Sequence, residues 1–209
     1  MTQHSMDLRS RLENFRQIIC TTVCTNLQGD IIELEVGMNL AMQWLEEIRR
    51  NKAALYIVGN GGSAAVASHA QTDFINVACL KTQVLHEPAV LTCMTNDYGY
   101  ENAYARMLSI MIESNDCLIA ISSSGKSVNI CRAVHEARAR GLKIITLSGF
   151  YEDNPLRKLG DLNYWLESTD YGFVEVGHQF ILHNLADRFG ALKAELAREK
   201  VQNHYVTAN

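Results

Sequence analysis

The chain has 209 residues, is 47% hydrophobic and 20% charged, and carries a formal net charge of −4. This composition supports a sizeable core, and two prolines and thirteen glycines exclude collagen-like and low-complexity chains. It gives no general electrostatic attraction to nucleic acid or anionic lipid, and no apolar run reaches the ~18 residues of a membrane span. The six cysteines form no CxxC pair, which argues against a zinc ribbon, and their apolar surroundings favour reduced thiols. We expect a cytoplasmic protein that binds neither nucleic acid nor membranes.

Two amphipathic helices are predicted at the start of the chain. Over residues 7–28, apolar side chains recur at spacings of three and four, and Gly29-Asp30 ends that pattern. A second helix with the same periodicity is predicted over 31–51. We expect residues 1–52 to form a helical extension whose apolar faces are covered by another subunit, and residues 53–209 to form the main domain.

From residue 54 onward, short apolar runs alternate with helical segments. The predicted strands are 55–58, 89–91, 117–121, 144–147 and 164–166. The predicted helices lie near 63–78, 101–114, 126–140 and 175–199. Continuously apolar strands that alternate with helices indicate a parallel sheet covered on both faces. We therefore expect an α/β fold, a doubly wound five-stranded parallel sheet with two N-terminal helices.

Two strand-to-helix turns have the composition of a phosphate site. Gly59-Asn60-Gly61-Gly62-Ser63 follows the first strand, and the serine-rich turn 122–127 follows the third. Ligands of such sheets bind beyond the carboxyl ends of the strands, where glycines admit a ligand and helix N-termini and hydroxyls donate to it. One such turn could serve only as a cap, but two in one sheet favour a phosphate-bearing ligand. Neither turn has the spacing of a nucleotide-binding fingerprint.

Histidines and carboxylates stand near the predicted site on two helices. His69 and Asp73 are spaced i, i+4, so both project from one helix face and suit either a metal or acid–base chemistry. A surface hydrogen-bonded pair is the alternative. On the last helix, Glu175 and His183 lie ~12 Å apart if that helix is straight. They could approach one ion only through long side chains, through a helix that begins near Gly177, or through a second subunit.

These motifs, together with Asn96-Asp97-Tyr98-Gly99, resemble the sugar isomerase (SIS) domain and, more narrowly, the phosphoheptose isomerases. Enzymes of that family convert sedoheptulose 7-phosphate to D-glycero-D-manno-heptose 7-phosphate. The resemblance covers nearly the whole chain. It implies a flavodoxin-like SIS fold and a homotetramer with active sites at subunit interfaces. It also implies a zinc ion in each subunit and a sugar-phosphate substrate.

The resemblance also implies roles for individual residues. Its phosphate and substrate positions fall on Asn60, Gly61, Gly62, Ser63, Asp97, Ser122, Ser123, Ser124, Ser127 and Glu175. Its zinc ligands fall on His69, Asp73, Glu175 and His183. Asp73 is the expected base and His183 the residue that exchanges protons with the sugar oxygens. Asp73 replaces a glutamate of the family, Glu175 replaces a glutamine, and Val77 replaces an arginine.

The implied reaction is aldose–ketose isomerisation by proton transfer through an enediol. Two alternatives stay open. Val77, Asp73 and Glu175 favour an isomerase of a different sugar phosphate. A non-catalytic SIS module would instead bind a sugar phosphate or a protein such as the replication initiator. The presence of both Asp73 and His183 favours the enzyme.

Overall fold

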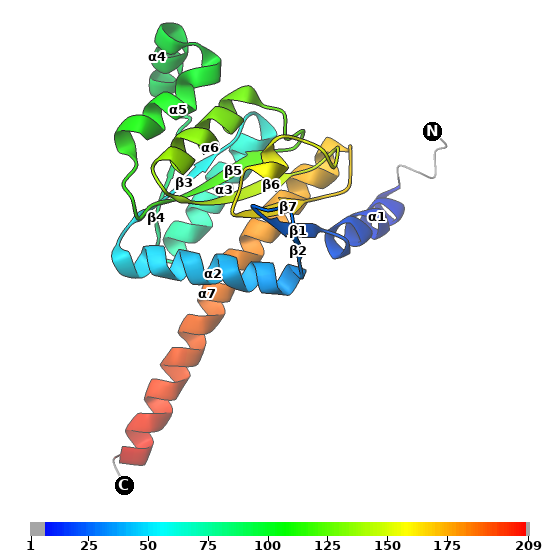
Figure 1. Ribbon diagram of the computed structural model, residues 1–209. Coiled ribbons are helices and arrows are strands. Elements are labelled where there is room, and N and C mark those ends of the chain that lie inside the picture. Colours follow the sequence, from blue (N-terminus) through cyan, green and yellow to red (C-terminus); the bar gives the residue numbers. More distant parts are fainter. Residues whose placement is uncertain (1–6, 208–209) are drawn as a thin grey trace.

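A mixed β-sheet forms the centre of the protein (Figure 1) in the computed structural model, which describes residues 7–207 and their side chains as far as residue 192. Within these residues there are seven strands, in the order β2-β1-β7-β6-β5-β3-β4. The strands are β1 (Val23–Asn26), β2 (Ile31–Ile32), β3 (Ala54–Val58), β4 (Lys81–Val84), β5 (Cys117–Ser122), β6 (Lys143–Ser148) and β7 (Leu162–Trp165). Strands β3 to β7 are parallel, and β1 and β2 are antiparallel to their neighbours. The parallel strands have the flavodoxin-like order, so the predicted fold class is confirmed, with two additional antiparallel strands.

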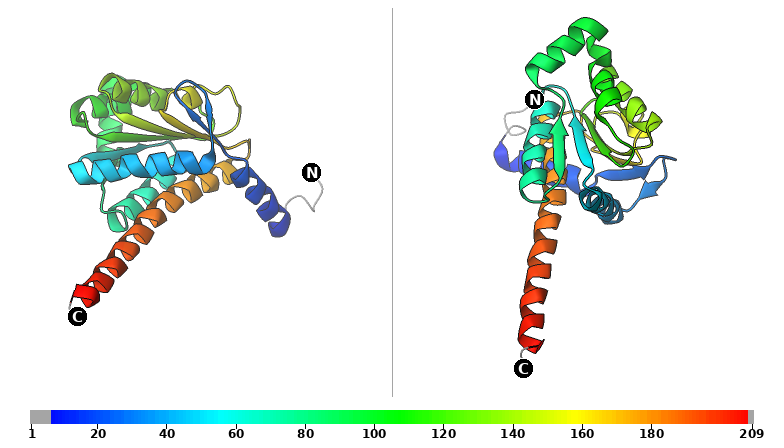
Figure 2. Two further views of the ribbon diagram at one scale, coloured as in Figure 1. Left: turned by 60° about the horizontal axis from the view of Figure 1, so that its bottom comes forward. Right: turned by 90° about the vertical axis from the view of Figure 1, so that its left-hand side faces the viewer.

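Helices cover both faces of the sheet (Figure 2). The helices are α1 (Leu8–Cys20), α2 (Leu34–Asn51), α3 (Gly62–Asn76), α4 (Pro88–Tyr98), α5 (Tyr100–Met111), α6 (Val128–Ala139) and α7 (Tyr171–Thr207). Helices α2, α3 and α7 pack on one face, and α5 and α6 pack on the other. None of the helices in the described part of the chain is both long enough and apolar enough to cross a membrane.

Each face of the sheet has its own apolar core. Along the central strand β5, Ile119 and Ile121 point to the core that contains α2, α3 and α7, whereas Leu118 points to the core that contains α5 and α6. All six residues of β5 are buried. Burial on both sides explains the continuous apolar run that made this strand predictable.

The prediction of a strand at 89–91 is wrong, because these residues lie in α4. Pro88 stands in the first turn of that helix, and the Glu87 carboxylate caps it by accepting a hydrogen bond from the Val90 amide at 2.8 Å. The strand that fills this place in the sheet is β4. It is an edge strand in which Lys81 and Gln83 are exposed, so it lacks the continuous apolar run of a central strand.

The first predicted helix is also too long. Helix α1 ends at Cys20, and the chain then forms the β1–β2 hairpin, which turns at Gly29 with φ of +87°. Val23 and Leu27 continue the helical spacing of α1, although Val23 lies in a strand. Residues 23–51 therefore contribute two strands and a packed helix to the same sheet and core as the rest of the chain.

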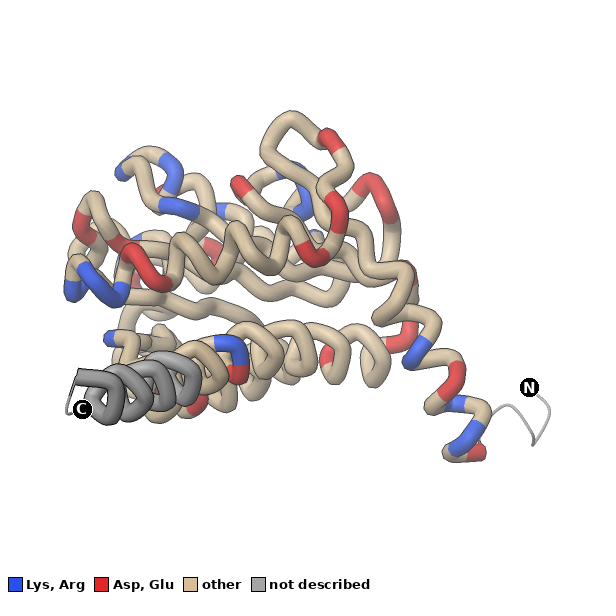
Figure 3. Tube along the Cα trace, turned by 90° about the horizontal axis from the view of Figure 1, so that it is seen from below, with Lys and Arg blue, Asp and Glu red and all other residues tan. Residues whose placement is uncertain are grey.

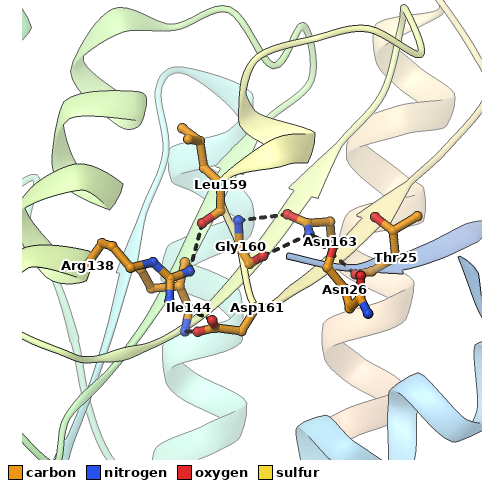
Figure 4. Close-up of polar contacts among 8 residues, drawn as sticks. All are labelled: Thr25, Asn26, Arg138, Ile144, Leu159, Gly160, Asp161 and Asn163. Carbon is orange, nitrogen blue, oxygen red and sulfur yellow. Dashed lines mark hydrogen bonds and ion pairs between the residues drawn. The ribbon is translucent and has the colours of Figure 1, made fainter. Parts of the chain in front are cut away.

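A polar network joins the hairpin to the parallel part of the sheet (Figure 4). The Asn163 side chain is fully buried, and its Nδ2 donates to the carbonyls of Thr25 and Asn26, both at 3.3 Å. Next to it, Asp161 accepts hydrogen bonds from the Ile144 amide and from Arg138. These bonds hold β1, β6 and β7 together at the end of the sheet opposite the phosphate turns.

Charges of both signs are mixed on the surface. Seen from below (Figure 3), basic residues are interspersed with acidic ones along the chain. Examples are the ion pairs Arg49–Glu46 at 2.7 Å and Arg188–Glu35 at 2.6 Å. This distribution agrees with the small net charge of the sequence.

Candidate active site

Helices α3 and α7 lie side by side and run in the same direction from the carboxyl edge of the sheet. Near their N-termini, a Cβ on Gly62 would overlap the Glu175 carboxylate. Further along, His69 of α3 contacts His183 of α7. The two helices therefore carry the candidate residues in matching order, beginning at the strand ends where ligands of this fold bind.

A cavity of about 240 Å³ lies at the N-termini of these helices. It is lined by Asn60, Gly61, Gly62, Ser63, Ile121, Ser122, Ser123, Ser124, Ser127, Tyr171 and Glu175. The predicted phosphate turns thus meet at one place. None of these lining residues is Lys or Arg, so an anion would be held by hydroxyls and backbone amides. A larger cavity, of about 550 Å³, lies away from this site beside the β1–β2 hairpin.

The serine hydroxyls of the residues that line the cavity differ in their hydrogen bonding. Ser122 Oγ donates to Ser127 Oγ at 3.1 Å. The hydroxyl of Ser123 is buried and has no hydrogen-bond partner among the described residues. Because an unpaired buried hydroxyl is costly, a polar group bound next to Ser123 would stabilise it.

The serine-rich turn depends on a glycine and on a buried asparagine behind it. Gly125 has φ of +63°, and a Cβ there would overlap the Asn154 side chain. Asn154 is fully buried, and its Nδ2 donates to the Gly149 carbonyl at 3.2 Å and to the Tyr151 carbonyl at 2.8 Å. The loop after β6 therefore packs against the serine-rich turn and stabilises it.

His69, Asp73 and His183 form a group that could hold a metal ion, with ligand atoms within 4.8 Å of one another. His69 Nε2 lies 3.0 Å from His183 Nε2, and Asp73 Oδ2 lies 3.2 Å from His183 Nδ1. Asp73 Oδ2 is buried and accepts no hydrogen bond from any residue that the structure describes. The predicted i, i+4 pair on α3 is thus brought together with the histidine of the last helix.

Glu175 does not belong to the His–Asp group, and Asp97 does not line the cavity. Helix α7 begins at Tyr171, which removes the alternative of a helix that begins near Gly177, and Glu175 lies outside the three-residue group, on the cavity wall. Gly177 serves close packing instead, since a Cβ there would overlap Leu166. Asp97 is exposed at the end of α4, where it accepts a hydrogen bond from Asn96 at 2.9 Å, and it does not line the cavity.

His178 of α7 is fully buried. Its Nε2 lies 3.1 Å from the carbonyl of Ser148, the last residue of β6. Burial lowers the pKa of His178 to about 4, so the ring is neutral near pH 7. A neutral ring donates from Nε2 to this carbonyl, which ties α7 to the end of the sheet.

Sequence reasoning missed three residues around the cavity. Tyr171 contributes to its wall, and Asn129 and Tyr100 both bond to the Asn60 side chain. The spacing of Asn129 two residues after Ser127 was visible in the sequence, but nothing local connects it to Asn60. The contacts of these residues with the cavity and with Asn60 form only once the chain is folded.

Comparison with known proteins agrees with this geometry. Residues 24–149 match the family described as SIS domain. A phosphoheptose isomerase from Helicobacter pylori is 30% identical over 167 residues, which are 77% of this chain and 86% of that protein. The chain belongs to the SIS-domain phosphoheptose isomerase family.

Other members support this assignment. A phosphoheptose isomerase from Campylobacter concisus is 30% identical over 160 residues, covering 74% of this chain and 84% of that protein. The solved structure of a phosphoheptose isomerase from Francisella tularensis superimposes with a TM-score of 0.76 at 24% identity, covering 90% of this chain and 98% of that one. The superposition confirms the SIS fold over nearly the whole molecule.

Proposed function

We propose that this protein is an aldose–ketose isomerase that converts sedoheptulose 7-phosphate to D-glycero-D-manno-heptose 7-phosphate. One observation carries the proposal: the hydroxyl-lined cavity and the His–Asp group lie in sequence along the same two parallel helices. His69 follows Ser63 by six residues, about 9 Å along the axis of α3. In the substrate, the phosphate and the reacting carbons C1 and C2 stand at opposite ends of a seven-carbon chain, which fits such a separation.

In this mechanism the cavity binds the phosphate. The opposite end of the sugar is thereby held at the His–Asp group. Binding energy from the remote phosphate is thereby used to orient the carbons. Asp73 takes a proton from one carbon and returns it to the other, through an enediol. His183, whose Nδ1 lies 3.2 Å from Asp73 Oδ2, exchanges protons with the sugar oxygens.

We propose zinc as the ion for the His–Asp group. Two imidazole nitrogens and one carboxylate oxygen are ligands that zinc accepts, and they leave a position open for substrate. The buried Oδ2 of Asp73, which accepts no hydrogen bond from the described residues, fits this assignment, because a cation would satisfy it. Residues His69, Asp73 and His183 would hold the ion, and bound zinc would polarise the substrate carbonyl. Glu175 is better suited to the cavity, against which its carboxylate lies.

We also propose a homotetramer in which residues 1–52 form part of the contacts between subunits. Helix α1 has no buried residue along its described length. Leu8 is 84% exposed and Leu12 is 61% exposed, which favours a covering subunit. Light scattering tests this state, and a monomeric mass at micromolar concentration would refute it.

The decisive experiment is a discontinuous isomerisation assay on sedoheptulose 7-phosphate, with and without added zinc, and with His183→Ala as the control. Turnover by the wild type that is lost in the variant is the expected result. Absence of turnover by folded, metal-loaded protein would refute the heptose substrate. A panel of other sugar phosphates in the same assay would then test the alternative that Val77, Asp73 and Glu175 favour.

A further inference from the structure

Two residues that do not line the cavity, Asn129 and Tyr100, form hydrogen bonds to the Asn60 side chain of its wall. We propose that Asn129 and Tyr100 are positioning residues that fix the Asn60 side chain and so set the distance between the two phosphate turns. The proposal deepens the proposed function, because these turns would bind the phosphate of the substrate. Its test uses inorganic phosphate, however, so it does not depend on the identity of the sugar.

The first observation is a reciprocal pair of amides between the turns. Asn60 Nδ2 donates to Asn129 Oδ1 at 2.9 Å, and Asn129 Nδ2 donates to Asn60 Oδ1 at 2.9 Å. Asn129 is only 3% exposed, and its Oδ1 also accepts the Ile130 amide at 3.0 Å. Two hydrogen bonds in one planar pair fix orientation as well as distance. The turn after β3 is thus joined to the first turn of α6 at the neighbouring strand β5.

The second observation concerns helix α5, which also forms hydrogen bonds to the turn after β3. The Tyr100 hydroxyl donates to Asn60 Oδ1 at 2.7 Å. One helical turn later, the buried Tyr104 hydroxyl donates to the Gly59 carbonyl at 2.9 Å. Because Tyr100 and Tyr104 are spaced i, i+4, they lie on one face of α5 and hold two successive residues of the turn.

These contacts define what Asn60 does. Its Oδ1 accepts two hydrogen bonds, and its Nδ2 uses one of two protons within the pair. The side chain is therefore engaged mainly with the protein. Since the cavity lies between the two turns, the Asn60–Asn129 pair determines how wide it is.

The test compares Tyr100→Phe and Asn129→Asp with the wild-type protein. Tyr100→Phe removes one hydroxyl from a half-exposed side chain and should leave the melting temperature within 2 °C, as an order-of-magnitude expectation for a surface change. Asn129→Asp keeps the shape and the acceptor for Ile130, but it places two oxygens face to face. Tyr98→Phe is the matched control, because the Tyr98 ring faces Arg106 instead of Asn60.

The readouts are the dissociation constant for inorganic phosphate and the NMR resonances of the Asn60 side-chain amide. Loss of one hydrogen bond should weaken phosphate binding by about three- to tenfold in Tyr100→Phe, and by more in Asn129→Asp. In turnover, KM should rise by a similar factor while kcat changes by less than about threefold. The Asn60 amide resonances should move in both variants and stay in place in Tyr98→Phe.

Wild-type phosphate affinity in Tyr100→Phe would overturn the proposal, and this holds even if Asn129→Asp fails to fold. Unmoved Asn60 resonances would overturn it as well. Failure of the proposed function is a different result: the wild type would bind phosphate, with weaker binding in both variants, but would not isomerise the heptose phosphate.

Discussion

His69 and His183 face each other through their Nε2 atoms at 3.0 Å, one from α3 and one from α7. Two neutral rings can share only one proton at this contact, so one nitrogen must accept. Asp73 Oδ2 lies 3.6 Å from His69 Nε2 and adds a third electron-pair donor to the same small volume. A cation or a proton bound between these three electron-pair donors would stabilise their close approach.

The first prediction concerns the acid–base pair. Replacing Asp73 by Asn, or His183 by Ala, should lower kcat by at least about 10²-fold, because each change removes a group that carries a proton. Circular dichroism should show a retained fold, since His183 is 43% exposed and adds little to the core. His135→Ala, an exposed position on α6, serves as the control. Near-normal turnover in either site variant would exclude its assigned role.

A second prediction concerns metal content. Protein purified with zinc and dialysed should retain about one ion per subunit in elemental analysis. His69→Ala should lose most of it, because two protein ligands hold zinc far less tightly than three. A chelator should remove the metal and the turnover together, and added zinc should restore both. Full zinc content in His69→Ala would show that the ion binds elsewhere.

A third prediction uses the charge of Glu175. Its carboxylate lines a cavity in which no described lining residue is basic, and Lys126 of the adjacent turn faces the Tyr151 ring, with Nζ 4.9 Å from the ring centroid. Removing that charge in Glu175→Gln should strengthen phosphate binding by about three- to tenfold, since a like charge near 4 Å costs about 1 kcal/mol or more. Calorimetric titration with inorganic phosphate measures this. Weaker binding would mean that the carboxylate accepts a hydrogen bond from the ligand instead.

A fourth prediction follows from the buried ring of His178, whose pKa burial lowers to about 4. The unfolded chain, with an ordinary histidine pKa near 6.5, binds the proton first as the pH falls. The free energy of unfolding should therefore decrease between pH 6.5 and 4, by up to about 3 kcal/mol from this group.

Urea denaturation at several pH values tests the prediction on His178. His178→Gln should be less stable at pH 7, because it alters a buried contact, but its stability should depend less on pH in this window. An equally steep pH dependence in the variant would assign the effect to other groups.

The sequence predicted those parts of the fold that depend on local chemistry. The strand at 117–121 was recognisable because burial on both faces requires a continuous apolar run. The strand at 81–84 was not, since an edge strand needs only one apolar face and Lys81 and Gln83 point to solvent. Val23 was assigned to a helix because its spacing continues α1, and only pairing with Trp165 of β7 makes it a strand residue.

The candidate site could likewise be predicted only in those parts that depend on neighbouring residues in the sequence. The glycines and serines of the two turns were predictable because each turn is a run of consecutive residues whose backbone and hydroxyl chemistry can be recognised locally. The contact of Asn60 with Tyr100 and Asn129 could not be found, because it joins positions 40 and 69 residues apart in the chain. Likewise, the i, i+4 pair on α3 was visible, but only the parallel packing of α3 on α7 brings His183 to it.

The two edges of the sheet limit how this protein can associate. One edge strand, β2, is two residues long, and the other, β4, presents an exposed lysine. Short strands and outward lysines discourage pairing with a strand of another molecule. We therefore expect neighbouring copies to meet through helices and loops instead of extending the sheet, and the protein to resist strand-mediated aggregation at high concentration.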